Sequence, residues 1–234
     1  MQTQTTARYA IVAALPREIA ALVKGTSPDR ALLRQGIHLH RLPSAIVVAG
    51  GMGAARVTLA VEAALQHGPE VQEFVSAGLA GACSPSLAPG DVVRAAIVID
   101  ANTGERYDTA RNGLPVADAV LVSTDSIASL QEKARLQATY AASIVDMEAA
   151  TVARMARAHG REFRAIKAIS DAHDFELASL SRFAGKRGTF RTGAFAVHTA
   201  LRPYQWKKTM QLGRHSQRAL QALASALQEL LRGS

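Results

Sequence analysis

The sequence has 234 residues, 48% of them hydrophobic, and a formal net charge of +8. A chain of this length can bury a sizeable core, and its apolar content excludes general disorder. It contains no run of about 18 apolar residues, so no membrane-spanning helix is expected.

Cysteine use and the N-terminus indicate the cellular compartment. Cys83 is the single cysteine, which excludes an internal disulfide framework and favours a reducing environment. The N-terminal stretch "MQTQTTARYAIVAAL" has a short apolar run that soon meets an acidic residue, which predicts a first strand and no secretory signal. We therefore expect a cytoplasmic protein in which Cys83 is a small buried thiol.

The positive charge is concentrated near the C-terminus. Residues 181–234 hold ten Lys or Arg and one acidic residue, Glu229, for a local charge of +9, whereas the first 180 residues carry −1. Such a basic region favours contact with phosphates, anionic lipid or nucleic acid. A solvated cationic face is the alternative.

Strand-like and helix-like patterns alternate along the chain. The first part of the chain predicts a strand in 8–15, a short helix in 16–23 with Pro16 in its first turn, a hairpin formed by 37–43 and 44–51, and a glycine-rich turn and helix in 51–68. The middle predicts strands in 71–82, 89–101 and 119–126, followed by a helix in 129–140 that is capped by Ser129 with Glu132 three residues on. The last part predicts a strand end and helix in 142–160, a strand in 162–171 and an amphipathic helix in 215–233.

This alternation predicts the fold class. Strands interleaved with helices favour a three-layer α/β/α fold, and the hairpin together with the consecutive strands favours a mixed central sheet. No linker or internal repeat is present. We expect one domain over 1–234, with a basic C-terminal extension from about residue 181.

Five strand ends carry distinctive residues: "AALPREIAAL", "AGGMGAAR", "SAGLAGACSPSLAPGD", "VDMEAA" and "AISDAHD". Ligands of open α/β sheets collect at the carboxyl ends of strands, and glycines there let a ligand approach the backbone. Each motif alone is weak, because tight turns use the same residues. In this order and spacing they resemble the purine nucleoside phosphorylase and nucleosidase superfamily over residues 8–175. They are most similar to the methylthioadenosine/S-adenosylhomocysteine nucleosidases, with some likeness to hopanoid-associated phosphorylases.

The resemblance implies that a purine (adenine) nucleoside is cleaved at its N-glycosidic bond, as in methionine salvage. Glu148 would accept hydrogen bonds from the ribose 2′- and 3′-hydroxyls, with Met147 packed against the sugar. The alternative for Glu148 is a charge at a helix N-terminus. Asp146 would point the other way by strand alternation, as a structural or capping group.

The same resemblance assigns two catalytic carboxyls. Asp171 would be the general acid at purine N7, positioned by Ser170, and it must hold a proton near neutral pH, which burial can arrange. Its alternative is a helix cap. Glu18 would orient the attacking water at C1′, and the anionic groups together would stabilise an oxocarbenium-like transition state.

The resemblance also places further residues at the substrate: Met52, Gly78, Leu79, Ile127, Lys167 and Phe183. Three of these depart from the family pattern. Leu79 stands where many relatives have Ser, Ile127 where an aromatic often stacks on the purine, and Lys167 where Arg is frequent. Phe183 would cover the purine pocket, or else be a core aromatic.

Phosphorolysis is the alternative to hydrolysis. Arg17 and Arg56 are the cations that could hold phosphate, although Arg56 is expected to face solvent. A carboxylate at Glu18 would repel phosphate, which favours water as the nucleophile.

The C-terminal region suggests other partners. Tyr204, Trp206, Lys207 and Lys208 could touch a membrane surface, as an adenosylated lipid substrate (adenosylhopane-like) would require, or form a packing or oligomer surface. The resemblance implies a homodimer with no metal or organic cofactor. A non-enzymatic basic module for nucleic acid or membrane is the remaining hypothesis. The chain carries no nucleic-acid motif, so we expect no nucleic-acid partner.

Overall fold

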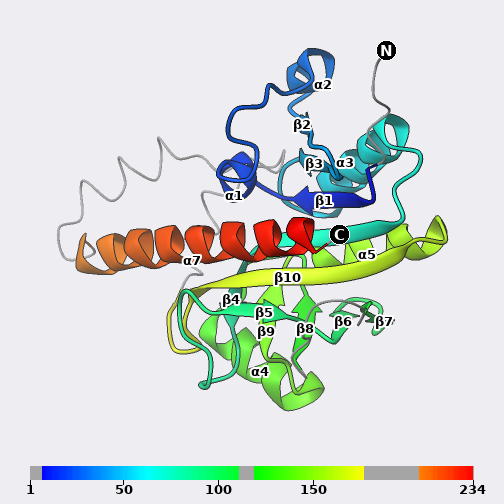
Figure 1. Ribbon diagram of the computed structural model, residues 1–234. Helices are drawn as coiled ribbons and strands as arrows, with labels where there is room; N and C mark the ends of the chain where they lie inside the picture. Colours follow the sequence, from blue (N-terminus) through cyan, green and yellow to red (C-terminus); the bar gives the residue numbers. More distant parts are fainter. Residues whose placement is uncertain (1–6, 111–118, 177–205, 234) are drawn as a thin grey trace, which may run out of the picture.

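The computed structural model describes residues 7–110, 119–176 and 206–233, with the backbone alone for 206–212 (Figure 1). Its described strands are β1 (Tyr9–Ala13), β2 (His38–Arg41), β3 (Ala45–Ala49), β4 (Glu73–Ala82), β5 (Val92–Arg94), β6 (Ile97–Asp100), β7 (Arg106–Asp108), β8 (Val120–Ser123), β9 (Ile144–Asp146) and β10 (Glu162–Asp171). The described helices are α1 (Pro16–Ile19), α2 (Arg30–Arg34), α3 (Ala54–His67), α4 (Leu130–Tyr140), α5 (Ala149–Ala158) and α7 (Trp206–Arg232).

The strands form one mixed sheet in the order β2-β3-β1-β4-β9-β8-β6-β7, and β10 pairs with β4 and β5. Parallel ladders join β1 to β3 and β4, β4 to β10, and β8 to β6 and β9. The β2–β3 hairpin and the β4–β9, β6–β7 and β5–β10 pairs are antiparallel. The mixed sheet and the hairpin are therefore confirmed.

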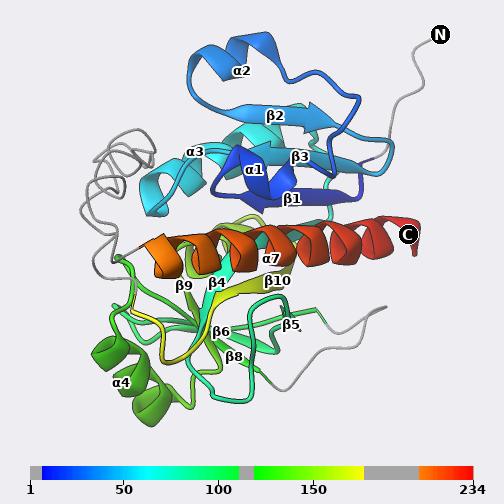
Figure 2. The ribbon, with the colours of Figure 1, turned by 90° about the vertical axis from the view of Figure 1, so that its left-hand side faces the viewer.

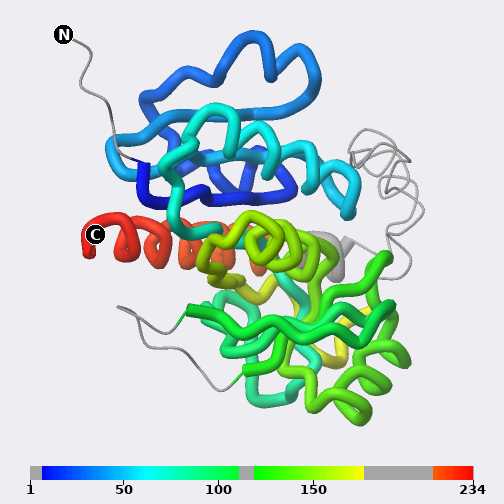
Figure 3. The backbone as a smooth tube through the Cα atoms, turned by 90° about the vertical axis from the view of Figure 1, so that its right-hand side faces the viewer, coloured from blue at the N-terminus to red at the C-terminus, as the bar shows by residue number. Residues whose placement is uncertain are grey.

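Helices cover both faces of this sheet, as the three-layer prediction requires. α3 and α5 lie together on one face (Figure 3), and α1 and α7 lie on the other, where α7 crosses β10 and β4 (Figure 2). Side chains of β1 alternate between the two cores: Val12 packs in the same cluster as Val57 of α3, and Ile11 packs with Leu223 of α7. The strand is buried throughout because both its faces are covered.

Several helix boundaries follow local rules. The Ser129 hydroxyl accepts the backbone N–H of Glu132 at 3.2 Å and caps α4, as predicted. α1 begins at Pro16 but ends at Ile19, one turn earlier than expected. α7 begins at Trp206 and not at 215. Its first turns mix the apolar Trp206, Met210 and Leu212 with polar residues and contain Gly213, so the regular apolar spacing that identifies a helix starts only beyond that glycine.

The structure also departs from the predicted elements elsewhere in the chain. The expected strand in 89–101 is two strands, β5 and β6, and neither β7 nor α2 was predicted. Phe183 and Tyr204 lie outside the described residues. In the described part of the chain, no helix combines the length and hydropathy needed to cross a bilayer.

Candidate active site

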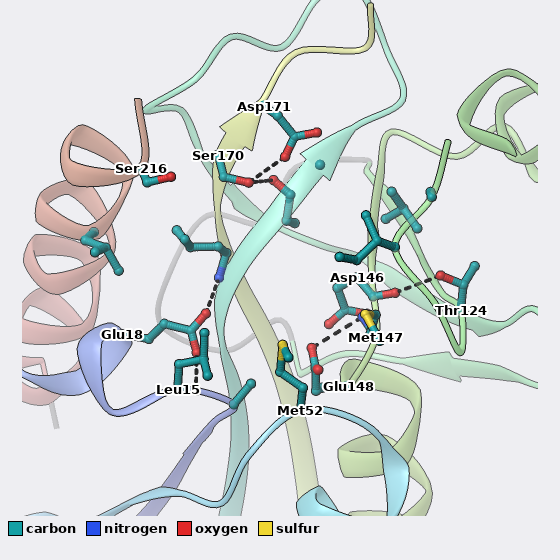
Figure 4. A pocket seen from close by; sticks show the side chains of 18 of the residues that line it. Leu15, Glu18, Met52, Thr124, Asp146, Met147, Glu148, Ser170, Asp171 and Ser216 are labelled. Atoms are coloured by element: carbon teal, nitrogen blue, oxygen red, sulfur yellow. Dashed lines mark hydrogen bonds between the residues drawn. The ribbon is translucent and has the colours of Figure 1, made fainter. Parts of the chain in front are cut away.

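A cavity of about 510 Å³ opens where several strands end, with walls from α1, α4 and α7 (Figure 4). The predicted site residues that line it are Glu18, Met52, Leu79, Ile127, Met147, Glu148, Ser170 and Asp171. Glu18, Glu148 and Asp171 come from three distant parts of the chain and point into this one space (Figure 4). The structure therefore brings together eight of the eleven predicted residues.

Glu18 lies in α1, shortly after β1, and its carboxylate is held by backbone amides. Its Oε2 accepts the N–H of Leu15 at 2.8 Å and its Oε1 accepts the N–H of Leu79 at 3.0 Å, while the side chain is only 7% exposed. Gly78 does not line the cavity but lies under this carboxylate, because a Cβ there would come within 3.1 Å of Oε1. The two amide donors therefore fix the position of this carboxyl group at the cavity.

Glu148 stands between β9 and α5 on the opposite wall. Its Oε1 accepts the N–H of Gly53 and its Oε2 that of Met147, both at 3.3 Å. Burial, followed by the charge of Asp146, raises the pKa of Glu148 to about 7, and the charge of Lys167 opposes this shift. The carboxylate is therefore poorly compensated until another donor reaches it.

Asp146 supports this wall from behind. Its Oδ2 accepts the N–H of Ala149 at 3.0 Å, its Oδ1 accepts the hydroxyl of Ser123 at 2.6 Å, and Lys167 Nζ lies 2.8 Å from Oδ2. The predicted capping role is confirmed by the bond to Ala149, which begins α5. Ser123 was not predicted; it ties β8 to the same helix by accepting the N–H of Ala150 at 2.9 Å.

Lys167 lies behind the cavity and does not line it. Its ammonium contacts Asp146 and also donates to the Ser76 hydroxyl at 3.0 Å, and Lys167 as a whole is 1% exposed. Burial alone would lower the pKa of Lys167, but Asp146 and Glu148 raise it above the usual value. The residue thus acts on the site through its bond to Asp146 and through its charge, which lowers the pKa of Glu148.

Asp171 ends β10 in a dense polar cluster. It is 2% exposed; its Oδ1 lies 2.6 Å from Ser170 Oγ and its Oδ2 lies 2.5 Å from Lys133 Nζ. Gly81 of β4 makes room for the cluster, because a Cβ there would come within 2.9 Å of Oδ2. Ser170 thus contacts the carboxylate that it was predicted to position.

Lys133 is a site residue that sequence reasoning missed. It lines the cavity from α4 at 2% exposure. Its position three residues before Leu136, which is fully buried, placed it on the inward face of the helix. A charged residue on the buried side of an amphipathic helix was the signal, since such groups need a partner.

The two arginines considered for phosphate differ. Arg17 lines the cavity and is exposed. Arg56 is half-exposed, and its guanidinium donates to the carbonyls of Gly50, Gln35 and Gly36 at 2.5, 3.3 and 2.8 Å. Arg56 therefore anchors the loop before β2 to the turn after β3, because several carbonyls converge on one planar donor.

The C-terminal helix contributes a wall that was not expected. Gly213, Ser216, Gln217 and Leu220 of α7 line the cavity, and Ser216 lies beside it in Figure 4. The basic C-terminal region thus reaches the site.

Charge in the cavity is mostly negative. The carboxyl groups of Glu18, Glu148 and Asp171 lie along it, and the fully buried carboxylate of Asp146 lies behind it. The ammonium of Lys133 is already paired. Among the described residues, no group of three or more His, Cys, Asp or Glu side chains is arranged to hold a metal ion.

Comparison with known proteins agrees with this architecture. The family model described as the phosphorylase superfamily matches residues 8–110 and 101–194. A search of curated protein sequences gives no match.

Similar solved structures include 5′-methylthioadenosine/S-adenosylhomocysteine nucleosidases from Neisseria meningitidis (TM-score 0.70, 16% identity, 97% of this chain and 99% of that chain) and Helicobacter pylori (TM-score 0.69, 17% identity, 98% and 99%). Futalosine hydrolase of Helicobacter pylori gives a TM-score of 0.68 at 17% identity over 98% and 99% of the two chains. At these identities the likeness is one of fold, and the family model supplies the assignment: this chain belongs to the phosphorylase superfamily.

Proposed function

We propose that this protein hydrolyses the N-glycosidic bond of a purine nucleoside, with adenine as the base, in the manner of methylthioadenosine/S-adenosylhomocysteine nucleosidases. The observation that carries the proposal is the convergence of Glu18, Glu148 and Asp171 on one cavity. Breaking a sugar–purine bond leaves positive charge on the sugar and negative charge on the base, and different groups must stabilise the two charges.

Each carboxyl has a task that its surroundings suit. Glu148 accepts hydrogen bonds from the ribose hydroxyls, with Met147 and Met52 against the sugar. Glu18, held by two amides, orients a water toward C1′ and accepts its proton. Asp171 faces the base at the other end of the cavity, with Ser170 at its Oδ1.

Lining residues match an uncharged, flat base. Leu79 and Ile127 supply apolar surface where an aromatic ring is absent, so the base is packed without stacking. Gly78 and Lys167 contribute indirectly, the first beneath Glu18 and the second behind Asp146.

Water, rather than phosphate, suits the charge of this cavity. Phosphorolysis needs cations around the nucleophile, yet Arg56 is bound to carbonyls and the ammoniums of Lys133 and Lys167 are paired with carboxylates. Arg17 is the cation on the lining that holds no ion pair among those found in the described residues. A dianion beside Glu18 would be repelled.

Adenine release, measured by chromatography with and without phosphate, tests the proposal. Methylthioadenosine, S-adenosylhomocysteine, adenosine and an adenosylated lipid serve as substrates. Release that does not depend on phosphate is expected, with free sugar as the product. Formation of a sugar 1-phosphate would establish the phosphorylase alternative, preference for the lipid would establish the adenosylhopane-like alternative, and no turnover of any substrate would contradict enzymatic cleavage.

The proposal extends to assembly and location. A homodimer in the cytoplasm, acting in methionine salvage, is consistent with the family resemblance and with Cys83 being a free buried thiol. The basic start of α7, with Trp206, Lys207 and Lys208, is proposed as a contact for an anionic membrane surface. Light scattering measures the mass in solution, and sedimentation with anionic vesicles measures the contact.

A further inference from the structure

One buried charge in the cavity has no task in the mechanism above. Lys133 contacts Asp171, the carboxyl that faces the base, and both side chains are at most 3% exposed. Burying an ammonium is costly even when it is paired, so a structural ion pair could be replaced by apolar residues at little loss of stability. The position of this pair, on the wall of the cavity, points to a use in the reaction.

The ammonium is saturated by acceptors from one short segment. Besides Asp171 Oδ2 at 2.5 Å, Lys133 Nζ donates to the carbonyls of Ala172 at 2.8 Å and Phe175 at 3.4 Å. A lysine side chain has three donors and no acceptor when protonated, so three acceptors specify the charged form. Because all three donors are used, Lys133 acts through Asp171 and not on the substrate directly.

The other partner of Asp171 is a hydroxyl with a single hydrogen. Ser170 Oγ lies 2.6 Å from Asp171 Oδ1 and 3.2 Å from the carbonyl of Ala80, and it can donate to only one of them. When Asp171 is ionised, the hydroxyl donates to Oδ1. When Asp171 is protonated on that oxygen, the hydroxyl can turn to Ala80 and accept. The cluster therefore accommodates Asp171 with or without a proton.

We propose that Lys133 is a positioning residue for departure of the base: it fixes Asp171 at the purine end of the cavity and supplies, through that carboxylate, the proton that the leaving purine takes up. This inference rests on the proposed function. In the step, the C1′–N9 bond breaks and its electron pair passes to the purine. Purine N7 takes a proton from Asp171, which takes one from Lys133 Nζ. Water bonds to C1′ and gives its proton to Glu18. Lys133, left as a neutral amine, and Glu18, left protonated, return to their starting states by exchange with solvent.

The proposal is tested by how strongly the loss of rate in a Lys133 variant depends on the leaving group of the substrate. Lys133→Met removes the ammonium and keeps the stem, so the rate should fall only where the leaving group needs a proton. The purine nucleoside that the wild type cleaves best is compared with 4-nitrophenyl riboside, whose leaving group departs as a stable anion. We expect kcat for the purine nucleoside to fall about 100- to 1000-fold with little change in KM, and kcat for the nitrophenyl riboside to stay within about threefold.

Lys167→Met is the matched control. It also removes a buried, paired ammonium, but on the ribose side of the cavity. It should lower activity toward both substrates in parallel. Circular dichroism and thermal unfolding establish that each variant is folded. Equal losses on both substrates in Lys133→Met, or no loss on the purine nucleoside, would overturn the proposal.

Chemical rescue of the rate provides a second test, because an added amine would not restore activity if Lys133 had only a structural role. Gly81 lies next to the lysine stem, because a Cβ placed on this glycine would come within 3.2 Å of Lys133 Cε, so Lys133→Ala leaves space there. Added ethylammonium should fill this space and restore cleavage of the purine nucleoside in proportion to its concentration. Lys133→Arg keeps a cation that cannot give up its proton, so it should not restore the rate. Failure of the ethylammonium rescue, or wild-type activity of a folded Lys133→Arg variant, contradicts the relay. Failure of the wild type to release base from any nucleoside contradicts the proposed function itself.

Discussion

The surroundings of Glu148 disfavour its charged form. Burial and the neighbouring Asp146, with a smaller effect of Glu18, raise its pKa to about 7, and the two amides that bind it are 3.3 Å away. A ribose diol would add two short hydrogen bonds to the ionised form. In the free protein near neutral pH the Glu148 carboxyl is thus partly protonated, and nucleoside binding should release a proton.

This titration predicts the pH dependence of activity. kcat/KM for the nucleoside should rise between pH 6 and pH 8 as Glu148 ionises, because only the ionised form accepts both ribose hydroxyls. Glu148→Gln should lower kcat/KM at pH 8 about 100-fold or more and remove this rise. Initial rates of adenine release across the pH range measure both effects. A Glu148→Gln variant with full activity would contradict the ribose assignment.

The same shift predicts a pH-dependent cost in stability. The unfolded chain ionises Glu148 near pH 4.5 and the folded protein near pH 7, so its contribution to folding is intact below pH 4.5 and is lost as the pH rises through about 7. Since the side chain is partly exposed to the cavity, we expect a loss of about 1–3 kcal/mol. Urea unfolding should show Glu148→Gln more stable than the wild type at pH 8 but not at pH 4.5. Glu62→Gln, on the exposed face of α3, is the control, and equal effects at both pH values would contradict the assignment.

At the scale of elements, α7 joins the core to the site. Leu223 and Leu227 are fully buried against the cluster that contains Ile166 of β10, and Ser216 and Leu220, one to two turns earlier, line the cavity. The helix therefore holds one wall of the site by the burial of its C-terminal half. The expectation of a single domain with a basic extension is still a prediction, but in the described residues this part of the chain is packed on the sheet (Figure 1).

Leu223→Ala tests the packing of α7. Removing a fully buried leucine should lower the free energy of unfolding by about 2–4 kcal/mol, because a cavity is left between the helix and the sheet. Ser225→Ala, exposed on the same helix, should change it by less than about 0.5 kcal/mol. Urea denaturation followed by circular dichroism measures both. Equal stability of the two variants would mean that α7 does not support the sheet.

At the scale of the molecule, the site forms where strands and helices from distant parts of the sequence come together. Residues from α1, β4, β9, β10, α4 and α7 line one cavity, so a bound nucleoside would contact elements that are otherwise joined through the core. Ligand binding should therefore stabilise the whole fold and not one segment.

Thermal unfolding with a non-cleavable analogue tests this. Formycin A, whose glycosidic bond joins two carbons, should raise Tm by about 5–10 °C at 100 times its Kd, as mass action requires for a protein of this size. Adenine alone should raise it less at equal concentration, since it lacks the sugar that Glu148 binds. Identical shifts in Tm with adenine and formycin A would contradict the assignment of Glu148 to the ribose hydroxyls.

The sequence by itself determined the alternation of elements, the mixed sheet and the strand ends that carry Glu18, Glu148 and Asp171. These features follow from hydrophobic period and from local turn residues, which act over a few positions in the chain. Only the tertiary structure decided the partners of those carboxyls. Lys133 meets Asp171 across 38 positions, Lys167 reaches Ser76 across 91, and α7 returns from the end of the chain to close the cavity. Such contacts depend on how buried charges find compensation once the sheet is assembled, and no local pattern encodes that choice.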